Sequence, residues 1–337
     1  MKKMVIIILA LFCSLALFST GFAEPIICKI ADPTPKTFSY YEALLTFEKE
    51  VEAATGGKVD VQIFGDGVLG RHQTTTESTM MGSIQGTVVT SAWTQNLVKE
   101  HKLFTLPFLW PNYEGYRAWL DSAEGDRVGN LLEAKGLKFL GYAHTGWLGV
   151  MNTKKEIRTK DDFKGLKIRT MPDSVLVDSI SSLGCMGIAM GPGELYSAVQ
   201  QGVIDGVSTA PQFLNVLKMQ ELCKYFTDLK LHASPATFIV NLKFFNSLSP
   251  DIQKAFIEAG ENFEKNSDAY YIDDSNATSD NNILNSVFAK AGVKNYYPTA
   301  AEKASYKELT KPVFMKYREQ VGPELVDSVV DFLKKYE

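Results

Sequence analysis

The sequence predicts an α/β fold built from parallel strands, and three observations support this prediction. Residues 163–211 alternate short apolar runs with helical patterns, in the order strand, helix, strand, helix, strand. Residues 26–64 show the order strand, helix, strand. The chain of 337 residues is also long enough for two domains. Strands and helices that alternate at this spacing form βαβ units, so we expect parallel sheets flanked by helices.

The segment 163–211 has the clearest pattern. Apolar runs predict strands at 166–168, 186–190 and 203–206. The two stretches between them repeat apolar residues every three or four positions, which is typical of amphipathic helices, and Gly184 is a plausible stop for the first helix. Ligands in open α/β sheets bind beyond the carboxyl ends of the strands. Residues that follow these strands are therefore the first candidates for a binding site.

Arg169 is the most informative of these residues, because a planar guanidinium can hold a carboxylate through two hydrogen bonds. Most arginines are solvated surface residues. A position after a buried strand and before a helix favours a binding role instead. The two tryptophans that lie near strand ends can equally be core residues. Although Arg169 could be a surface residue and the tryptophans could be core residues, all three follow strands, and so do several hydroxyl side chains. We therefore expect the ligand site to contain Arg169, Trp147, Ser208, Thr209, Ser91 and Trp93.

Two runs in this segment resemble the core signature of the solute-binding subunits of tripartite ATP-independent periplasmic (TRAP) transporters, the DctP family. The first run reads DFKGLKIR at 162–169, where the family has D-l-K-G-l-K-i-R. The second reads PGELYSAVQQGVIDG at 192–206, where the family has a proline followed by E-l-y-x-A-l-q-x-G-v-v-D-G. The runs stand in the family's order and spacing, and the resemblance covers essentially the whole chain after residue 23.

The resemblance implies a two-lobed periplasmic binding protein fold, in which each lobe is a sheet flanked by helices and a long helix bridges the lobes. We expect residues 24–146 plus 236–275 in lobe I and residues 147–235 plus 276–337 in lobe II. The chain would then cross between the lobes near 146–147 and 235–236, and these crossings are the expected hinges.

A single long helix is predicted from Asp251 to about Phe288, after Ser249 and Pro250. It resembles the bridging helix of the TRAP binding subunits. Two further helices are expected at about 300–321 and 323–335.

The implied function is that of an extracytoplasmic solute-binding protein of a TRAP-type secondary transporter. Such a protein captures a small organic acid between two closing lobes and delivers it to the integral-membrane TRAP permease subunits. In the family, the arginine that matches Arg169 anchors the carboxylate of the solute. Many members carry a second arginine on the strand that enters the second domain, where this chain reads WLGV at 147–150. Many also carry Gln or Glu and then Asn after Asp-Gly, where this chain reads VSTA at 207–210. These departures favour a less charged or more apolar carboxylate than a sugar acid.

Two other functions fit parts of the pattern: the ligand-binding partner of a signalling receptor, and a secreted hydrolase. The hydrolase has little support, because the sequence contains no GxSxG, no SxxK and no P-loop, and its four histidines have no metal-binding spacing. Residues 65–70 match GxGxxG, but Asp66 would place a carboxylate beside the pyrophosphate, so we interpret them as a turn. We therefore expect no enzymatic activity and no cofactor, and we identify no metal-ligating residues in the sequence.

The N-terminus predicts the compartment. Lys2 and Lys3 precede an apolar run, and Gly21 and Ala23 supply the small residues of a cleavage site. Residues 1–23 are thus expected to be a signal peptide that directs the chain to the periplasm. No other segment is apolar enough to span a bilayer, so the mature chain is not expected to insert into the membrane.

Charge and cysteine content agree with such a protein. The net charge of −4, without clusters of lysine and arginine, argues against nucleic-acid binding. Three cysteines follow residue 23, and none of them is spaced as CxxC. We expect Cys28, Cys185 and Cys223 to be small buried hydrophobic residues.

Overall fold

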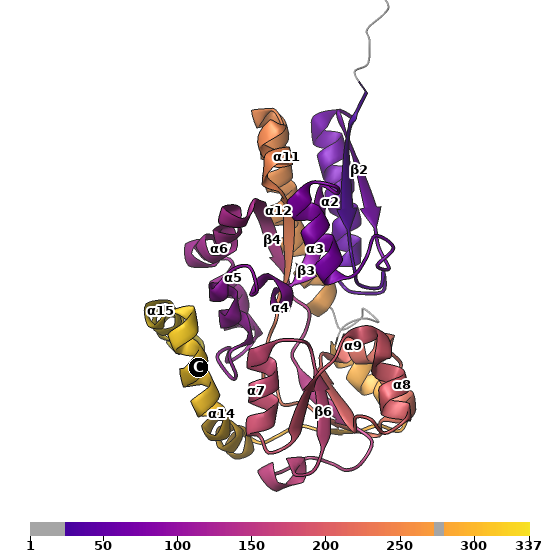
Figure 1. Ribbon diagram of the computed structural model, residues 1–337, viewed down its shortest axis with the longest axis vertical. Coiled ribbons are helices and arrows are strands. Elements are labelled where there is room, and N and C mark those ends of the chain that lie inside the picture. The colour runs from indigo at the N-terminus through magenta and orange to yellow at the C-terminus, as the bar shows by residue number, and fades with distance from the viewer. Residues whose placement is uncertain (1–23, 273–279) are drawn as a thin grey trace, which may run out of the picture.

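The computed structural model describes residues 24–272 and 280–337, and two sheets, each with its own helices, form its two lobes (Figure 1). The predicted two-lobed α/β fold is confirmed. The predicted signal peptide, residues 1–23, lies outside the described residues. In order across the first sheet, the strands are β2 (Val59–Phe64), β1 (Ile26–Ala31), β3 (Gly86–Thr90), β10 (Ala236–Asn241) and β4 (Leu137–Ala143). In order across the second sheet, they are β11 (Lys294–Tyr296), β9 (Tyr225–Thr227), β5 (Gly149–Asn152), β8 (Gly206–Thr209), β6 (Lys167–Thr170) and β7 (Met186–Ala189).

The βαβ units predicted in residues 163–211 are present. Strand β6 pairs in parallel with both β7 and β8. Helix α7 (Ser174–Ser182) connects β6 to β7, and helix α8 (Leu195–Gln200) connects β7 to β8. The side chain of Asp173 caps the N-terminus of α7 by accepting hydrogen bonds from the amides of Val175 and Leu176. This arrangement brings the carboxyl ends of β6 and β8 to the same edge of the sheet.

Each sheet also contains an antiparallel strand, which the sequence patterns did not reveal. Strand β10 runs antiparallel to β3 and β4, and β5 runs antiparallel to β8 and β9. Both are the first strand after the chain crosses from one sheet to the other. The crossing segments lie side by side, with a bridge between Trp147 and Ala233. A chain that arrives at the edge where the parallel strands end must run in the opposite direction to enter the sheet.

The first sheet packs against helices α2 (Tyr41–Thr55) and α12 (Pro250–Ile272) on one face. Aromatic contacts dominate this core: the ring centroid of Phe238 lies 4.8 Å from that of Phe47 and 5.1 Å from that of Phe263. Burial of such side chains supplies most of the stabilisation of the lobe. Helix α2 ends where Gly56 adopts a left-handed conformation with φ 60°, as its sequence predicts. The other helical elements on or beside this sheet are α3 (His72–Met81), α4 (Ser91–Thr94), η1 (Lys99–Thr105), α5 (Tyr113–Leu120), α6 (Ala123–Asn130), η2 (Leu131–Lys135) and α11 (Leu242–Ser247).

The second sheet has a buried cluster on each face. One cluster joins the sheet to α8, α9 (Pro211–Val216), α10 (Met219–Leu222) and the π-helical turn η5 (Ile283–Phe288). The other joins it to α7 and to Tyr306. Cys28, Cys185 and Cys223 are all buried, as expected. The short elements η3 (Lys160–Phe163), η4 (Pro192–Glu194) and α13 (Asp280–Asn282) complete this lobe.

The helix predicted from Asp251 to about Phe288 is present in two described parts. Helix α12 is described as far as Ile272 and packs on the first sheet, whereas η5 packs on the second sheet. Residues 273–279 lie outside the described residues. The segment therefore serves both lobes, and its continuity as a single helix stays a prediction.

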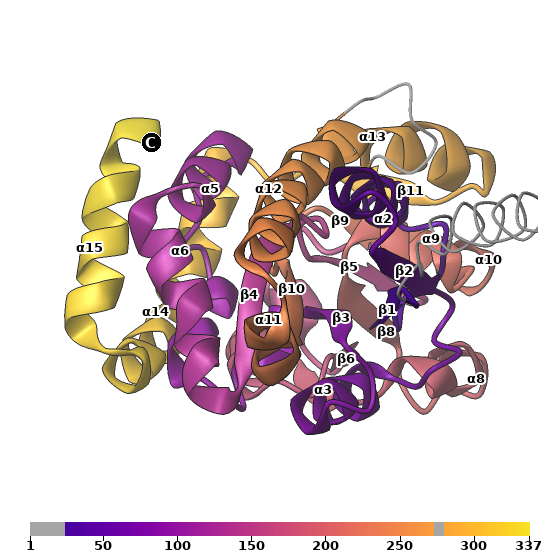
Figure 2. The ribbon, with the colours of Figure 1, turned by 90° about the horizontal axis from the view of Figure 1, so that it is seen from above.

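The C-terminal helices contact both lobes. Helix α14 (Ala300–Val321) packs against α7 and η1, and α15 (Pro323–Leu333) packs against α5, beside which it lies in Figure 2. Val326 and Leu333 share a buried cluster with Phe104 and Trp119 of the first lobe. Helix α15, which was predicted to belong to lobe II, packs against residues of the first lobe. The lobe boundaries themselves stay predictions.

Candidate ligand-binding site

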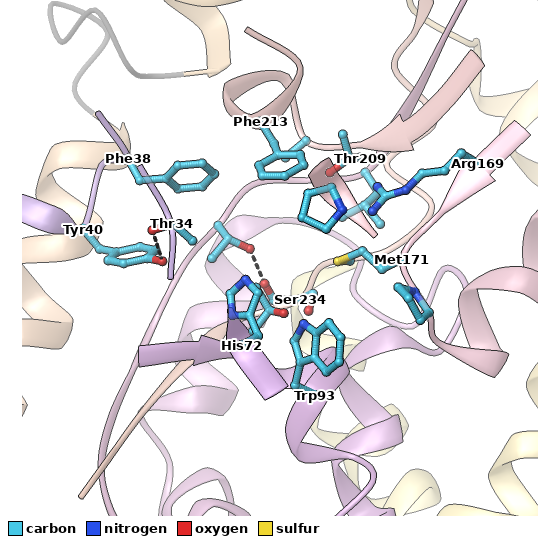
Figure 3. A pocket seen from close by; sticks show the side chains of 16 residues that line it. Thr34, Phe38, Tyr40, His72, Trp93, Arg169, Met171, Thr209, Phe213 and Ser234 are labelled. Carbon is cyan, nitrogen blue, oxygen red and sulfur yellow. Dashed lines mark hydrogen bonds between the residues drawn. The ribbon is translucent and has the colours of Figure 1, made fainter. Parts of the chain in front are cut away.

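A cavity lies where the carboxyl ends of the parallel strands of both sheets face each other (Figure 3). Its empty volume is about 650 Å³, including the part that is open to solvent. Residues from both lobes and from both crossing segments line it. They are Thr34, Phe38, Tyr40, His72, Thr90, Trp93, Thr145, Leu148, Arg169, Met171, Pro172, Pro192, Thr209, Ala210, Phe213 and Ser234.

Arg169 extends from β6 into this cavity. Pairing of β6 with β7 and β8 fixes its backbone, and its Nε donates a hydrogen bond to the carbonyl of Met190 at 2.8 Å. The residue is only 1% exposed, and its Nη1 has no hydrogen-bond partner among the described residues. Burial lowers the pKa of the guanidinium to about 10, so it is still charged at neutral pH. The cavity therefore contains a buried cation with unused hydrogen-bond donors.

Trp93 and Thr209 also line the cavity, as we expected from their positions after strands. Trp93 comes from α4, directly after β3, and its ring stacks on that of His72 with centroids 5.8 Å apart and an interplanar angle of 16°. Thr209 is the last residue of β8. The structure thus brings three of the six expected residues together at one site.

The other three expected residues lie outside the described lining. Ser208 precedes Thr209 on β8, and successive side chains of a strand point to opposite faces. The hydroxyl of Ser91 lies 3.0 Å from that of Ser234, so Ser91 supports a lining residue from behind. Trp147 belongs to a buried aromatic cluster, in which its ring centroid lies 6.0 Å from that of Tyr116. The interpretation of Trp147 as a core residue, which the sequence left open, agrees with this packing.

Several lining residues were not anticipated. Thr34 follows β1, so the strand-end rule could have identified it. Tyr40 directly precedes α2, and its position in the sequence does not mark it as a lining residue. Phe38 and Phe213 carry no signal in the sequence, because they meet only through the packing of one lobe against the other. His72 begins α3 and stacks on Trp93 of the same lobe, a contact that its sequence position does not reveal. Figure 3 shows the rings of Phe38 and Phe213 next to each other at one end of the cavity.

A buried acid lies behind the first-lobe wall of the cavity. Asp32 is 0% exposed, and its Oδ1 accepts hydrogen bonds from the amide of Thr34 at 2.9 Å and from the hydroxyl of Thr34 at 2.6 Å. The hydroxyl of Tyr40 lies 3.4 Å from the same oxygen and 2.8 Å from that of Thr34. Burial raises the pKa of Asp32 to about 7, against the opposing effect of these hydrogen bonds. Asp32 thus orients two hydroxyls of the wall.

The other groups that could perform chemistry are few. No group of three or more histidine, cysteine, aspartate or glutamate side chains within residues 24–272 and 280–337 could hold a metal ion. Burial lowers the pKa of His72 to about 4, so its ring is neutral at pH 7. Within the same ranges, none of the helices combines the length and hydropathy that crossing a membrane requires.

Comparisons with known proteins agree on one family. A family model described as bacterial extracellular solute-binding protein, family 7 (DctP), matches residues 30–320. The C4-dicarboxylate-binding periplasmic protein DctP of Rhodobacter capsulatus is 29% identical over 322 residues, which cover 94% of this chain and 93% of that protein. A solute-binding protein of Verminephrobacter eiseniae is 33% identical over 217 residues, which cover 64% of this chain and 65% of that protein, slightly less than two thirds of its length.

A solved structure is similar over nearly the whole chain. The sugar acid binding protein DctPAm from Advenella mimigardefordensis, in complex with galactonate, has a TM-score of 0.84 and 26% sequence identity. The alignment covers 93% of this chain and 99% of that chain.

Proposed function

The chain belongs to family 7 of the bacterial extracellular solute-binding proteins, the DctP family, and from this premise we propose that its cavity captures a small organic acid through Arg169. It is a solute-binding protein of the TRAP type. We further propose that it delivers the acid to the membrane-embedded permease subunits of a TRAP transporter. Its proposed location is the periplasm, reached by way of the predicted signal peptide.

One observation carries the assignment of Arg169: its guanidinium is buried without a counter-charge. No carboxylate among the described residues lies within ion-pair distance of it, and burial is the cause of its lowered pKa. An unpaired buried charge is costly. A ligand carboxylate would remove that cost and would accept hydrogen bonds from the planar nitrogen fork.

The relatives support the choice of an acid. The Rhodobacter protein is named for C4-dicarboxylates and the Advenella protein holds galactonate, and both kinds of ligand carry a carboxylate. These names lend no support to the signalling-receptor partner or the secreted hydrolase. We propose accordingly that the chain binds its ligand without chemical conversion.

Closure of the two lobes about the crossings at 146–147 and 235–236 is part of this proposal. Gly146 has φ +97°, a conformation that favours glycine, and a Cβ built there would lie 2.7 Å from the Cβ of Ala210. Glycine has no Cβ, so its backbone can adopt the changes in φ and ψ that a hinge must absorb. We expect small-angle scattering to give a smaller radius of gyration at saturating ligand. An unchanged radius would contradict a hinge mechanism.

The test of the proposed function is a thermal-shift screen of the purified mature chain against organic acids, each paired with its neutral amide. A ligand at a hundredfold excess over its Kd stabilises the folded state by roughly 2.7 kcal/mol, which the screen detects. At least one acid should raise the melting temperature while its amide does not. If no acid in a broad screen of mono-, di- and hydroxycarboxylates is effective, or if amides are equally effective, the proposal is wrong.

A further inference from the structure

The charges that line the cavity can neutralise a single carboxylate. Arg169 is the one lysine or arginine among the described lining residues, and none of them is an aspartate or glutamate. His72 is neutral at pH 7, since burial lowers its pKa to about 4. The strand that enters the second lobe contributes Leu148, which is apolar, to the lining. A second carboxylate on the ligand would therefore be buried without a cation, which is strongly unfavourable.

Apolar and aromatic side chains form much of the cavity lining beside Arg169. Phe38 of the first lobe and Phe213 of α9 contact each other, with ring centroids 6.0 Å apart and tilted by 60°, and form one apolar wall. The stacked Trp93 and the side chain of Met171 continue this lining (Figure 3). Such walls bind the hydrocarbon part of a ligand through burial of apolar surface.

Most hydroxyls of the lining already have hydrogen-bond partners within the protein. A ligand hydroxyl that is buried without a partner weakens binding roughly 5- to 150-fold. A sugar acid carries several hydroxyls, so it needs several free partners. Those that the lining still offers include Thr90 Oγ1 and His72 Nδ1, which are buried without partners among the described residues. The bonds already made are Thr34 to Asp32, Tyr40 to Thr34, Ser234 to Ser91, and Thr145 to the carbonyl of Ser234.

From these three observations we propose that the ligand is a monocarboxylate with an apolar body, aliphatic or aromatic, and few further oxygens. Dicarboxylates and sugar acids are excluded as preferred ligands. This inference rests on the proposed function, because it takes Arg169 as the carboxylate anchor and then assigns the body of the ligand to the wall formed by Phe38 and Phe213.

A matched set of probes tests the inference by calorimetric titration of the full mature chain. Hexanoate, adipate and gluconate share one chain length and differ in a second carboxylate or in added hydroxyls; 4-methylpentanoate and phenylacetate vary the apolar body. We expect at least one of the three apolar monocarboxylates to bind with a Kd at least about tenfold lower than those of adipate and gluconate, the factor that corresponds to 1.4 kcal/mol.

A pair of variants links this preference to the wall. Phe213→Ala removes apolar contact surface and should weaken binding of the preferred monocarboxylate by about tenfold. Phe332→Ala is the matched control, because Phe332 is a half-buried phenylalanine on α15, outside the cavity lining, and should leave the Kd unchanged. If both variants bind like the wild type, the assignment of the ligand body to this wall is overturned.

The outcomes separate the two proposals. Tighter binding of adipate or gluconate overturns the inference and leaves the proposed capture of a carboxylate intact. Binding of none of the five probes, while the broad screen finds another acid, also overturns the inference alone. Failure of every acid in that screen overturns both.

Discussion

Two buried ionisable groups at the cavity, Asp32 of the first lobe and Arg169 of the second, differ in how the protein compensates their charge. In the first lobe, Oδ1 of Asp32 accepts hydrogen bonds from the amide and the hydroxyl of Thr34, and the hydroxyl of Tyr40 lies close to the same oxygen. In the second lobe, Arg169 donates to one carbonyl and forms no ion pair with any described residue. Both side chains are about equally buried.

The difference distinguishes a structural charge from a functional one. Hydrogen bonds from the same lobe compensate the desolvation of Asp32 in part, so this acid builds the wall without a ligand. The guanidinium of Arg169 lacks such compensation, and its unused donors face the space that a ligand would fill. A buried charge that the protein leaves incomplete is the better marker of a binding site.

The largest effect that this comparison predicts is on ligand affinity. Replacing Arg169 by alanine leaves the ligand carboxylate desolvated and unpaired, so the Kd of the identified ligand should rise roughly thirty- to several-thousand-fold, for a loss of about 2–5 kcal/mol. Arg169→Lys keeps the charge but loses the planar fork, so its effect should be smaller but clear. Calorimetric titration of both folded variants measures these changes.

Arg127→Ala is the matched control for that experiment. Arg127 pairs with Glu124 on the surface, where its side chain is 53% exposed, and should not affect the Kd. If Arg169→Ala binds within about threefold of the wild type, which is less than 1 kcal/mol, Arg169 is not the anchor and the comparison between the two charges loses its functional meaning.

Most of the fold could be predicted from the sequence, because local patterns of apolar residues and glycines indicate most of its strands and helices. Apolar runs bounded by glycine located β6 and β7, whereas the strand predicted at 203–206 overlaps β8 only at Gly206. The rule that ligands bind at strand ends pointed to Arg169, Trp93 and Thr209, although Arg169 lies within β6 and not after it. The antiparallel direction of β5 and β10 was missed, because strand direction depends on where the chain crosses between sheets and not on local composition.

The rest of the lining depends on packing that a single segment does not contain. Ser208 and Thr209 are adjacent and chemically alike, and a strand buried on both faces gives no alternation that shows which of them faces the cavity. Phe38 and Phe213 lie far apart in the sequence and meet only because the lobes face each other. Trp147 carries the same sequence signal as Trp93, but its ring lies among aromatic residues of the first lobe.

The smaller effect that the comparison predicts concerns Asp32 and pH. Burial raises the pKa of this acid to about 7 in the folded protein, whereas an unfolded aspartate titrates near pH 4. The folded state therefore binds the proton more tightly between about pH 4 and pH 7. The stabilisation that this proton provides is complete below pH 4 and is lost as the pH rises through 7. The asparagine of Asp32→Asn cannot ionise, so the variant does not lose this stabilisation as the pH rises.

We expect the free energy of unfolding of Asp32→Asn, minus that of the wild type, to increase by roughly 1–4 kcal/mol between pH 4 and pH 8. The variant thus becomes more stable relative to the wild type as the pH rises. Urea unfolding of both proteins at several pH values measures this difference, in which other buried acids such as Glu264 and Asp280 cancel because both proteins contain them. Asp331→Asn, at a surface carboxylate whose side chain is 70% exposed, is the control and should show no trend. If the difference in unfolding free energy between Asp32→Asn and the wild type does not change with pH, the prediction is wrong. The hydrogen-bond donors around Asp32 would then compensate its charge fully, whereas the charge of Arg169 has no such compensation.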